Sequence, residues 1–276
     1  MKIKKPMFVT LIIIGSIIAL FIAGRTYKAI QFNHEVKTLF SQAGEVSDKK
    51  FSYIQIQNLP DPVQRYFRFA LKEGCPYISY ARLKHSGQFK TGPSKEWVDI
   101  KGEQYFTTQI PGFVWKGSTT MFTARDMYLS NRGKLTVSLL SLFGIVDGQG
   151  EIYDQGELLR WLAESVWFPT NLLPGDNLQW VPMDGTSARL NFTYNNICIS
   201  YLVSFDDFGA ITEFKTKRYM NENDLEIWVG KVTDYREKAG MMIPFAIEAL
   251  YQLKDGDYSY AKFYLNEIEY DVPEKY

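Results

Sequence analysis

The charged residues whose spacing best suits chemistry are Arg160 and Glu164, which lie four positions apart in an aromatic-rich stretch. On a helix this spacing places both side chains on one face, where the guanidinium can pair with the carboxylate. Because Trp161, Leu162 and Trp167 lie beside them in the sequence, we expect the pair to be partly buried and to need complete hydrogen bonding. We interpret it as a structural ion pair; a ligand contact and acid/base catalysis by Glu164 are the alternatives.

The next candidate is His85, one of two histidines in the chain. It lies on the apolar side of an alternating stretch, Ala81–Phe89, and we interpret it as a buried residue with one hydrogen-bond partner. Its neighbour Ser86 points to the opposite face of a strand and cannot form a catalytic pair with it. A catalytic Glu164 would need a second titratable group close by, such as His85 or Asp154.

The stretch after Val146 superficially suggests a Ca²⁺ loop, because carboxylates alternate with glycines. The carboxylates are Asp147, Glu151, Asp154 and Glu157. Their spacing is not that of an EF-hand, and Asp154 with Glu157 matches a helix N-cap and capping box instead. The two cysteines, Cys75 and Cys198, are not in a metal-binding spacing. We therefore predict no metal and no cofactor.

Composition favours an apolar partner over a nucleic acid. Lysine plus arginine and aspartate plus glutamate number 31 each, so the net charge gives no reason to expect a polyanion as partner. The chain instead has 18 Tyr, 19 Phe and 6 Trp, a surplus that suits an apolar pocket with a few polar groups. The candidate ligand-binding residues are His85, Trp115, Arg160, Trp161, Glu164 and Trp167.

The N-terminal segment predicts a membrane anchor. Residues 7–24 contain no charged side chain, and lysines precede them while Arg25 follows. As a helix this segment would reach ~27 Å, near the thickness of the hydrocarbon core of a bilayer. A cleaved secretion signal is the alternative. Because large domains translocate largely regardless of charge, we expect a single-pass protein of the cell membrane, with its N-terminus in the cytoplasm and the rest outside. The expected parts are a basic N-terminus (1–6), the anchor (7–24), a helical stalk and linker (25–50) and one β-rich domain (51–276).

Alternating polar and apolar residues make the domain mainly β. The stretches Ala81–Phe89 and Ala188–Asn195 alternate with a period of two, and turn signals between further strand-like runs indicate about ten antiparallel strands. Two helices interrupt this pattern, one from Leu59 and one from Asp154. We predict a strongly curved antiparallel sheet or half-open barrel with these helices over its concave face. The second helix and the apolar run Leu135–Val146 either line a cavity or fill the core.

Four stretches carry a family resemblance: LPDPVQRYF at 59–67, PGFVWKG at 111–117, ARDMYLSNRGKL at 124–135 and GQGEIYDQGELLRWLAESVWFPTNLLP at 148–174. They resemble an uncharacterised bacterial family of membrane-anchored conserved domains. Its signatures are Leu-Pro-x-Pro-Val-x-Arg-Tyr and Arg-x-Leu-x-Glu-x-x-Trp-x-Pro, and the second includes Arg160, Glu164 and Trp167. The resemblance covers Leu59 to Tyr270 and implies no settled function.

A looser resemblance rests on Phe113-Val114-Trp115 and on Asp126 to Tyr128. These are similar to a Phe-x-Trp strand and its neighbour in the LolA and LolB lipoprotein carriers, whose half-open β-barrel holds acyl chains beneath helices. The chain departs from them in its uncleaved anchor. The resemblance implies an extracytoplasmic domain that binds a lipid or another apolar ligand, with the membrane bilayer as partner. The alternatives are an envelope hydrolase, with Glu164 as acid or base and Arg160 positioning an anionic group, and a non-catalytic scaffold.

Overall fold

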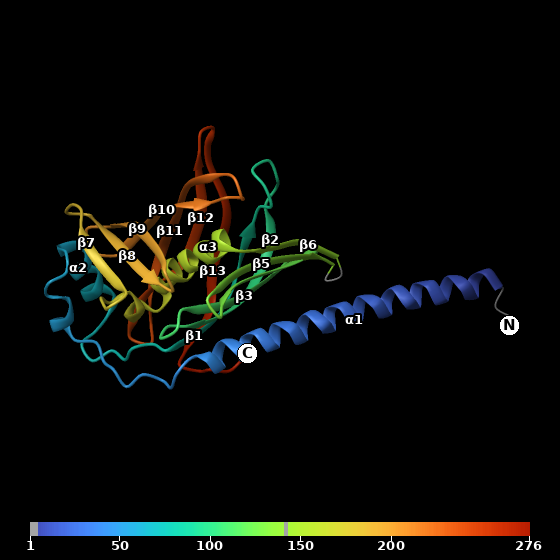
Figure 1. Ribbon diagram of the computed structural model, residues 1–276, viewed down its shortest axis with the longest axis horizontal. Coiled ribbons are helices and arrows are strands. Elements are labelled where there is room, and N and C mark those ends of the chain that lie inside the picture. The colour runs from blue at the N-terminus through green and yellow to red at the C-terminus, as the bar shows by residue number, and fades with distance from the viewer. Residues whose placement is uncertain (1–4, 141–142) are drawn as a thin grey trace.

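Thirteen strands form a single antiparallel sheet in the computed structural model, which describes residues 5–140 and 143–276 (Figure 1). The strands are β1 (Tyr80–Phe89), β2 (Val98–Thr107), β3 (Gly112–Ser118), β4 (Phe122–Leu129), β5 (Arg132–Leu139), β6 (Phe143–Gln149), β7 (Leu178–Pro182), β8 (Ser187–Tyr194), β9 (Ile197–Phe205), β10 (Ile211–Tyr219), β11 (Leu225–Lys238), β12 (Met241–Leu253) and β13 (Gly256–Tyr270). This confirms the mainly β prediction, with more strands than the about ten that turn signals indicated.

The sheet consists of two meanders that meet at its centre. Strands β1 to β6 follow one another to one edge, β7 to β13 return from the other edge, and β1 pairs with β13 so that Ala81 lies opposite Tyr270. The chain passes from the β6 edge to the β7 edge through α3 (Glu151–Glu164), η2 (Ser165–Trp167) and η3 (Pro169–Leu172). Because α3 contacts strands of both meanders, this connection crosses the concave face of the sheet (Figure 1).

The helix expected from Leu59 is present as α2 (Asp61–Ala70), preceded by the short η1 (Tyr53–Ile56). Pro62 lies in its first turn, where a helix tolerates proline because the missing N–H has no partner there. One side of α2 is buried and packs against β8 and β12. Its buried residues are Pro62, Val63, Tyr66, Phe67 and Ala70. This helix closes the β7 end of the concave face.

The second helix begins earlier than the capping-box spacing predicted. Gly150 is its N-cap residue, with a φ of 108° that favours glycine, so the expectation that Asp154 caps the helix is wrong. Asp154 is instead buried in the first turn, where its carboxylate accepts a hydrogen bond from the Gly133 backbone N–H at 2.7 Å and one from Arg132 at 2.9 Å. The acidic residue thus fixes the start of α3 to the β4–β5 turn.

The N-terminal helix α1 (Lys5–Gln42) leads away from the domain (Figure 1). Within the described part of the chain it is the one helix long and apolar enough to cross a membrane, and none of its apolar window is buried. Its other end packs on the sheet, because Phe32, Val36 and Leu39 are buried against side chains of β2, β3 and β4. Glu35 also accepts a hydrogen bond from Arg125 at 2.9 Å. The domain is therefore held directly on the helix.

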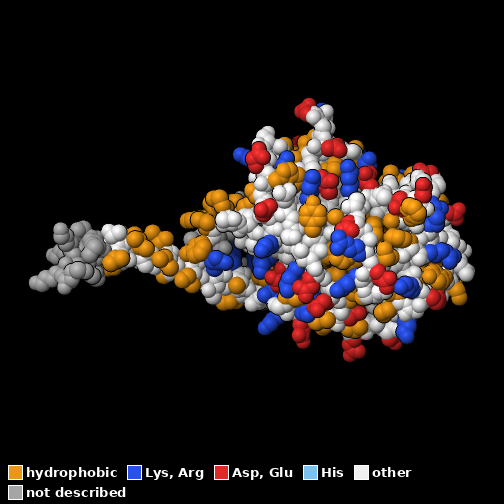
Figure 2. Space-filling view, turned by 180° about the vertical axis from the view of Figure 1, so that it is seen from behind, with side chains coloured by type: hydrophobic (Ala, Val, Ile, Leu, Met, Phe, Trp, Pro, Cys, Tyr) orange, Lys and Arg blue, Asp and Glu red, His pale blue; other side chains and the backbone are white. Residues whose placement is uncertain are grey.

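The apolar run Leu135–Val146 forms the β5–β6 hairpin, except for residues 141–142, which lie outside the described residues. Near the end of this hairpin, Phe143 is 63% and Ile145 58% exposed, and Leu140 and Met121 beside them are also exposed. We call these four residues the apolar tip. The hairpin reaches toward the side from which α1 leads away (Figure 1), and Figure 2 shows hydrophobic side chains gathered where the domain adjoins the helix.

Candidate functional site

A cavity of about 750 Å³ lies between α3 and the concave face of the sheet. Its wall is mainly aromatic and aliphatic, and it includes Trp115, Trp167, Trp228 and Phe263. The volume falls in the range of roughly 300–1,000 Å³ that is typical of small-molecule sites. The sequence left open whether the second helix and the run Leu135–Val146 line a cavity or fill the core. In the structure α3 and the β5–β6 hairpin line a cavity.

Small side chains on three neighbouring strands leave this space open. Gly230 lies opposite Ala249, and Ala249 lies opposite Ala261, so that a row of small residues crosses β11, β12 and β13 in the cavity wall. A Cβ atom on Gly230 would lie 2.7 Å from the Trp228 ring, so glycine is needed for that ring to lie flat along the strand. Close packing would place larger side chains at such positions. The row therefore makes the void a built feature of the sheet.

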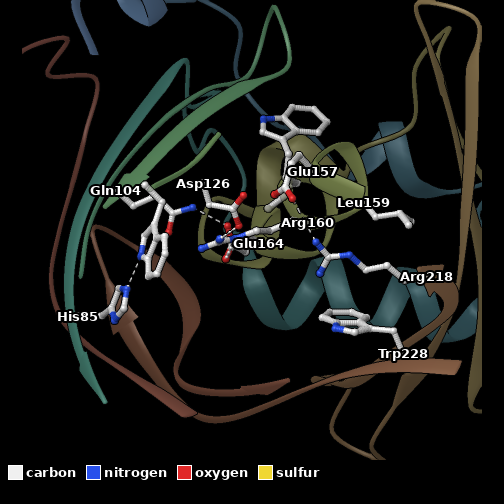
Figure 3. A network of polar contacts seen from close by, with 12 residues as sticks. His85, Gln104, Asp126, Glu157, Leu159, Arg160, Glu164, Arg218 and Trp228 are labelled. Carbon is white, nitrogen blue, oxygen red and sulfur yellow. Dashed lines mark hydrogen bonds and ion pairs between the residues drawn. The ribbon is translucent and has the colours of Figure 1, made fainter. Parts of the chain in front are cut away.

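Arg160 forms the centre of a polar cluster at the α3 side of the cavity (Figure 3). Its Nε donates to Glu164 Oε1 at 2.9 Å, and its Nη1 donates to Asp126 Oδ2 at 2.5 Å. The guanidinium also lies 4.8 Å from the ring centre of Trp115. The second oxygen of Glu164 accepts a hydrogen bond from Gln104 Nε2 at 2.6 Å. Arg160 is thus held by two carboxylates and an aromatic face, the arrangement that a buried cation requires.

Burial raises the pKa of both glutamates in this cluster. For Glu164 the Arg160 charge and the Gln104 amide oppose this increase. For Glu157 the pKa is raised well above its ordinary value, first by burial and then by the negative charge of Asp126. Asp126 Oδ1 and Glu157 Oε2 have no hydrogen-bond partner among the described residues, and a proton on Glu157 removes the repulsion between them.

Arg218 reaches the cavity from β10 and is held much less firmly (Figure 3). Its one hydrogen bond in the described part of the chain joins Nη2 to Glu157 Oε1 at 3.5 Å. Its guanidinium lies 5.8 Å from the ring centre of Trp228, whose Nε1 donates to the Tyr260 hydroxyl at 2.9 Å. The sequence reasoning missed Arg218. It could have been found from the strand period, because Arg218 lies four residues after the buried Phe214 and so faces the same side of the strand.

The structure separates the predicted ligand-binding residues into two groups. Trp115, Arg160, Glu164 and Trp167 lie in the cavity wall. Trp161 is instead buried on another side of α3, where its Nε1 donates to the Thr107 carbonyl at 2.9 Å and its ring packs on Phe192. It is part of the packed core.

His85 is buried in the core behind Trp115. Its Nε2 accepts a hydrogen bond from Trp115 Nε1 at 2.8 Å, and its ring stacks on Phe263 with ring centres 4.2 Å apart. Burial and the Arg160 charge lower the pKa of His85 to about 3, which keeps the imidazole neutral as an acceptor. A Cβ atom on Gly102 would lie 1.9 Å from His85 Nε2, so glycine makes room for the ring. His85 therefore sets the orientation of the Trp115 indole.

The other sites considered from the sequence are a metal site, the two cysteines and a second titratable group beside Glu164. Within residues 5–140 and 143–276, no group of three or more His, Cys, Asp or Glu side chains could hold a metal ion. Cys75 is a buried free thiol and Cys198 an exposed one. The side chains that hydrogen-bond to the Arg160–Glu164 pair are Gln104 and Asp126. The hydrogen bonds of His85 and Asp154 go to other residues.

Comparisons with known proteins give one match to a family and several distant structural likenesses. A model described as "Family of unknown function (DUF6544)" matches residues 49–263, and no curated protein matches the chain. A LolA superfamily protein from Nitrosomonas europaea is similar with a TM-score of 0.42 and 8% identity, covering 75% of this chain and 91% of its own. A putative outer membrane lipoprotein-sorting protein domain from Vibrio parahaemolyticus has a TM-score of 0.41 and 8% identity, covering 71% and 87%.

Proposed function

We propose that this chain, which belongs to the DUF6544 family of unknown function, is a membrane-anchored protein that binds a lipid or another apolar ligand between α3 and the concave face of its sheet. The observation that carries the proposal is the cavity of about 750 Å³ with its aromatic wall and row of small residues. Each CH₂ group moved from water into such a site contributes ~0.8 kcal/mol, so about ten of them gain ~8 kcal/mol before the costs of binding. That gain suits an alkyl chain.

The position of the apolar tip supports a membrane source for the ligand. Lys28 of α1 is within electrostatic range of Asp147 on β6. From Asp147 the strand continues four residues to Phe143, or ~13 Å, toward the side from which α1 leads away (Figure 1). The apolar segment of α1 begins four residues before Lys28, at Gly24, a rise of only ~6 Å. If α1 spans a bilayer, the apolar tip therefore reaches its surface, and the hairpin that ends in the tip also lines the cavity.

The hydrolase alternative gains no support from a specific contact. Both oxygens of Glu164 accept a hydrogen bond, one from Arg160 and the other from Gln104, so a substrate would compete with these partners for the carboxylate. A non-catalytic scaffold needs no cavity, and the space between α3 and the sheet is open. Ligand binding is the function that this geometry supports best.

Tryptophan fluorescence tests ligand binding directly. All 6 tryptophans follow the anchor segment in the sequence, and none belongs to the apolar tip, so we expect little contact between them and a brominated chain dissolved in the bilayer. We expect dibromostearyl alcohol to quench the full chain in lipid nanodiscs, because bromine quenches only at contact. Ala249→Phe fills the row of small residues and should remove most of the quenching. Thr233→Phe, at an exposed position of the same sheet, is the matched control and should behave like the wild type. Equal quenching of wild type and Ala249→Phe would contradict the proposal, as would no quenching of the wild type.

The orientation across the membrane is part of the proposal and has its own test. Cys198 is an exposed free thiol of the domain, whereas Cys75 is buried. A membrane-impermeant maleimide added to intact cells, or to cells with a permeabilised outer membrane if there is one, should therefore label the wild type and not Cys198→Ser. Labelling that requires lysis of the cytoplasmic membrane would place the domain in the cytoplasm.

A further inference from the structure

The two arginines of the cavity differ in how much of their hydrogen-bonding capacity is used. A guanidinium has five N–H donors. Arg160 donates to two carboxylates at 2.9 and 2.5 Å. Arg218 has one contact, to Glu157 at 3.5 Å, which is longer than an ordinary N–H···O bond. No other acceptor for Arg218 is found in the described part of the chain, although its side chain is only 14% exposed. Arg218 lies in the cavity wall, so its remaining N–H donors are available to a ligand there.

The side chains beside Arg218 add a donor. Tyr260 accepts a hydrogen bond from Trp228 Nε1, so its hydroxyl proton is left to donate, and it has no acceptor within the described residues. Tyr251 stacks on Tyr260 with ring centres 5.5 Å apart and uses its own hydroxyl on the Tyr219 carbonyl. This side of the cavity is therefore an aromatic surface with a guanidinium at one end and a free hydroxyl proton in its wall.

The charge of Arg218 also lacks a dedicated carboxylate. Asp126 and Glu164 are both bound by Arg160. The remaining neighbour, Glu157, has a pKa raised by burial and by Asp126, and its one contact with Arg218 is long, at 3.5 Å. A buried or half-buried cation is stable when an anion with good geometry completes its contacts. An anionic group of a ligand would supply the acceptors that the free donors of Arg218 lack.

We propose that Arg218 binds the anionic head group of the cavity's ligand, a carboxylate or a phosphate ester carried on an alkyl chain. The planar fork of a guanidinium matches two oxygens of either group. The chain then lies over the row formed by Gly230, Ala249 and Ala261, which begins on the strand next to Arg218. This inference rests on the proposed function and names the class of its ligand.

Three brominated probes with the same chain separate the head group from the chain. They are dibromostearate, dibromostearyl phosphate and dibromostearyl alcohol, each titrated at pH 8 into the full chain in nanodiscs. We expect at least one anionic probe to bind about tenfold or more tightly than the alcohol, the size of effect that a charged hydrogen bond gives. The tighter of the two anionic probes identifies the head group.

Variants of Arg218 then assign that preference. Arg218→Gln should bind the alcohol as the wild type does and lose the preference for the anionic probe. Lys217→Gln removes the same charge from an exposed neighbouring position and should keep the preference. Arg218→Lys retains the charge without the fork and should show a reduced preference, which decides the matter if Arg218→Gln does not fold.

Two results would overturn the inference while leaving the cavity function intact. One is equal affinity of wild type for all three probes, and the other is an undiminished preference for the anion in the folded Arg218 variants. Failure of every probe, including the alcohol, would instead refute the proposed function and this inference with it.

Discussion

The α3 side and the β10 side of the cavity each present an arginine, yet the two sites are built in opposite ways. Arg160 is fixed by Asp126, Glu164 and an aromatic face. Arg218 stands against Trp228 with one long contact to Glu157. Burial is nearly the same, since the side chains are 13% and 14% exposed.

Burial of a charged residue therefore does not by itself identify a binding site. A cation that is already paired with two carboxylates has little to gain from a further anion, because its charge is compensated. A cation with free donors gains from a ligand that accepts them. Sequence reasoning selected Arg160 because its partner lies on the same helix. The arginine with free donors is the one with no partner nearby in the sequence.

The same substitution at both arginines tests whether Arg160 stabilises the fold more than Arg218 does, and the larger effect is expected at Arg160. Arg160→Gln leaves Asp126 and Glu164 without a cation in a buried site, and we expect a loss of ~3–5 kcal/mol in the free energy of unfolding. Urea denaturation of the full chain in nanodiscs, followed by tryptophan fluorescence, measures it. A loss below ~1 kcal/mol, typical of an exposed pair, would show that Arg160 is not the structural cation.

Removing the carboxylate partner should have an effect of similar origin. Glu164→Ala leaves Arg160 with one carboxylate and Gln104 with no acceptor, so we expect a loss of ~3 kcal/mol. Glu164→Gln, which keeps the shape, should destabilise the fold less. If the two variants were equally destabilised, loss of the charge alone, and not loss of the side chain's shape, would account for the effect.

The pH dependence of stability distinguishes Glu157 from an ordinary counter-ion. Its pKa in the folded state lies well above the ordinary value of 4.5, so above pH 4.5 the unfolded state loses the proton first. Stability then falls as pH rises from 4.5 toward the raised pKa, with a slope of up to ~1.4 kcal/mol per pH unit from this group. Glu157→Gln should flatten that slope in the same denaturation experiment. An unchanged slope would mean that Glu157 is ionised and serves Arg218.

The smallest expected effect completes the comparison. Arg218→Gln removes one long contact, to an acid whose pKa burial raises, so we expect a loss of less than ~1 kcal/mol in the free energy of unfolding. The melting temperature of this variant beside that of Arg160→Gln gives the contrast in one experiment. Equal destabilisation by the two substitutions would remove the distinction between a structural and a ligand-binding arginine.

Local patterns predicted the elements better than the site. The alternation in Ala81–Phe89 gave β1 and its inward residues, and the position of Pro62 fitted the start of α2. The start of α3 was missed because Gly150 in a left-handed conformation provides it.

The contacts of Arg160 could be predicted only in part. Glu164, four residues away, followed from helical spacing. Asp126 and Gln104 join the cluster from 34 positions before Arg160 and 60 before Glu164. Such contacts depend on how distant strands are ordered in the sheet, and a single sequence carries no local signal for that order.

The pairing of β1 with β13 has a consequence for how the chain folds. Ala81 and Tyr270 lie opposite one another although they are 189 positions apart in the sequence. Contacts this distant in sequence slow folding, because the entropy of closing the intervening chain is lost before the contact stabilises anything. Until β13 emerges, β1 also has one unpaired edge, the kind that invites pairing with other chains. Truncation within β13 should therefore cause aggregation out of proportion to the few residues removed.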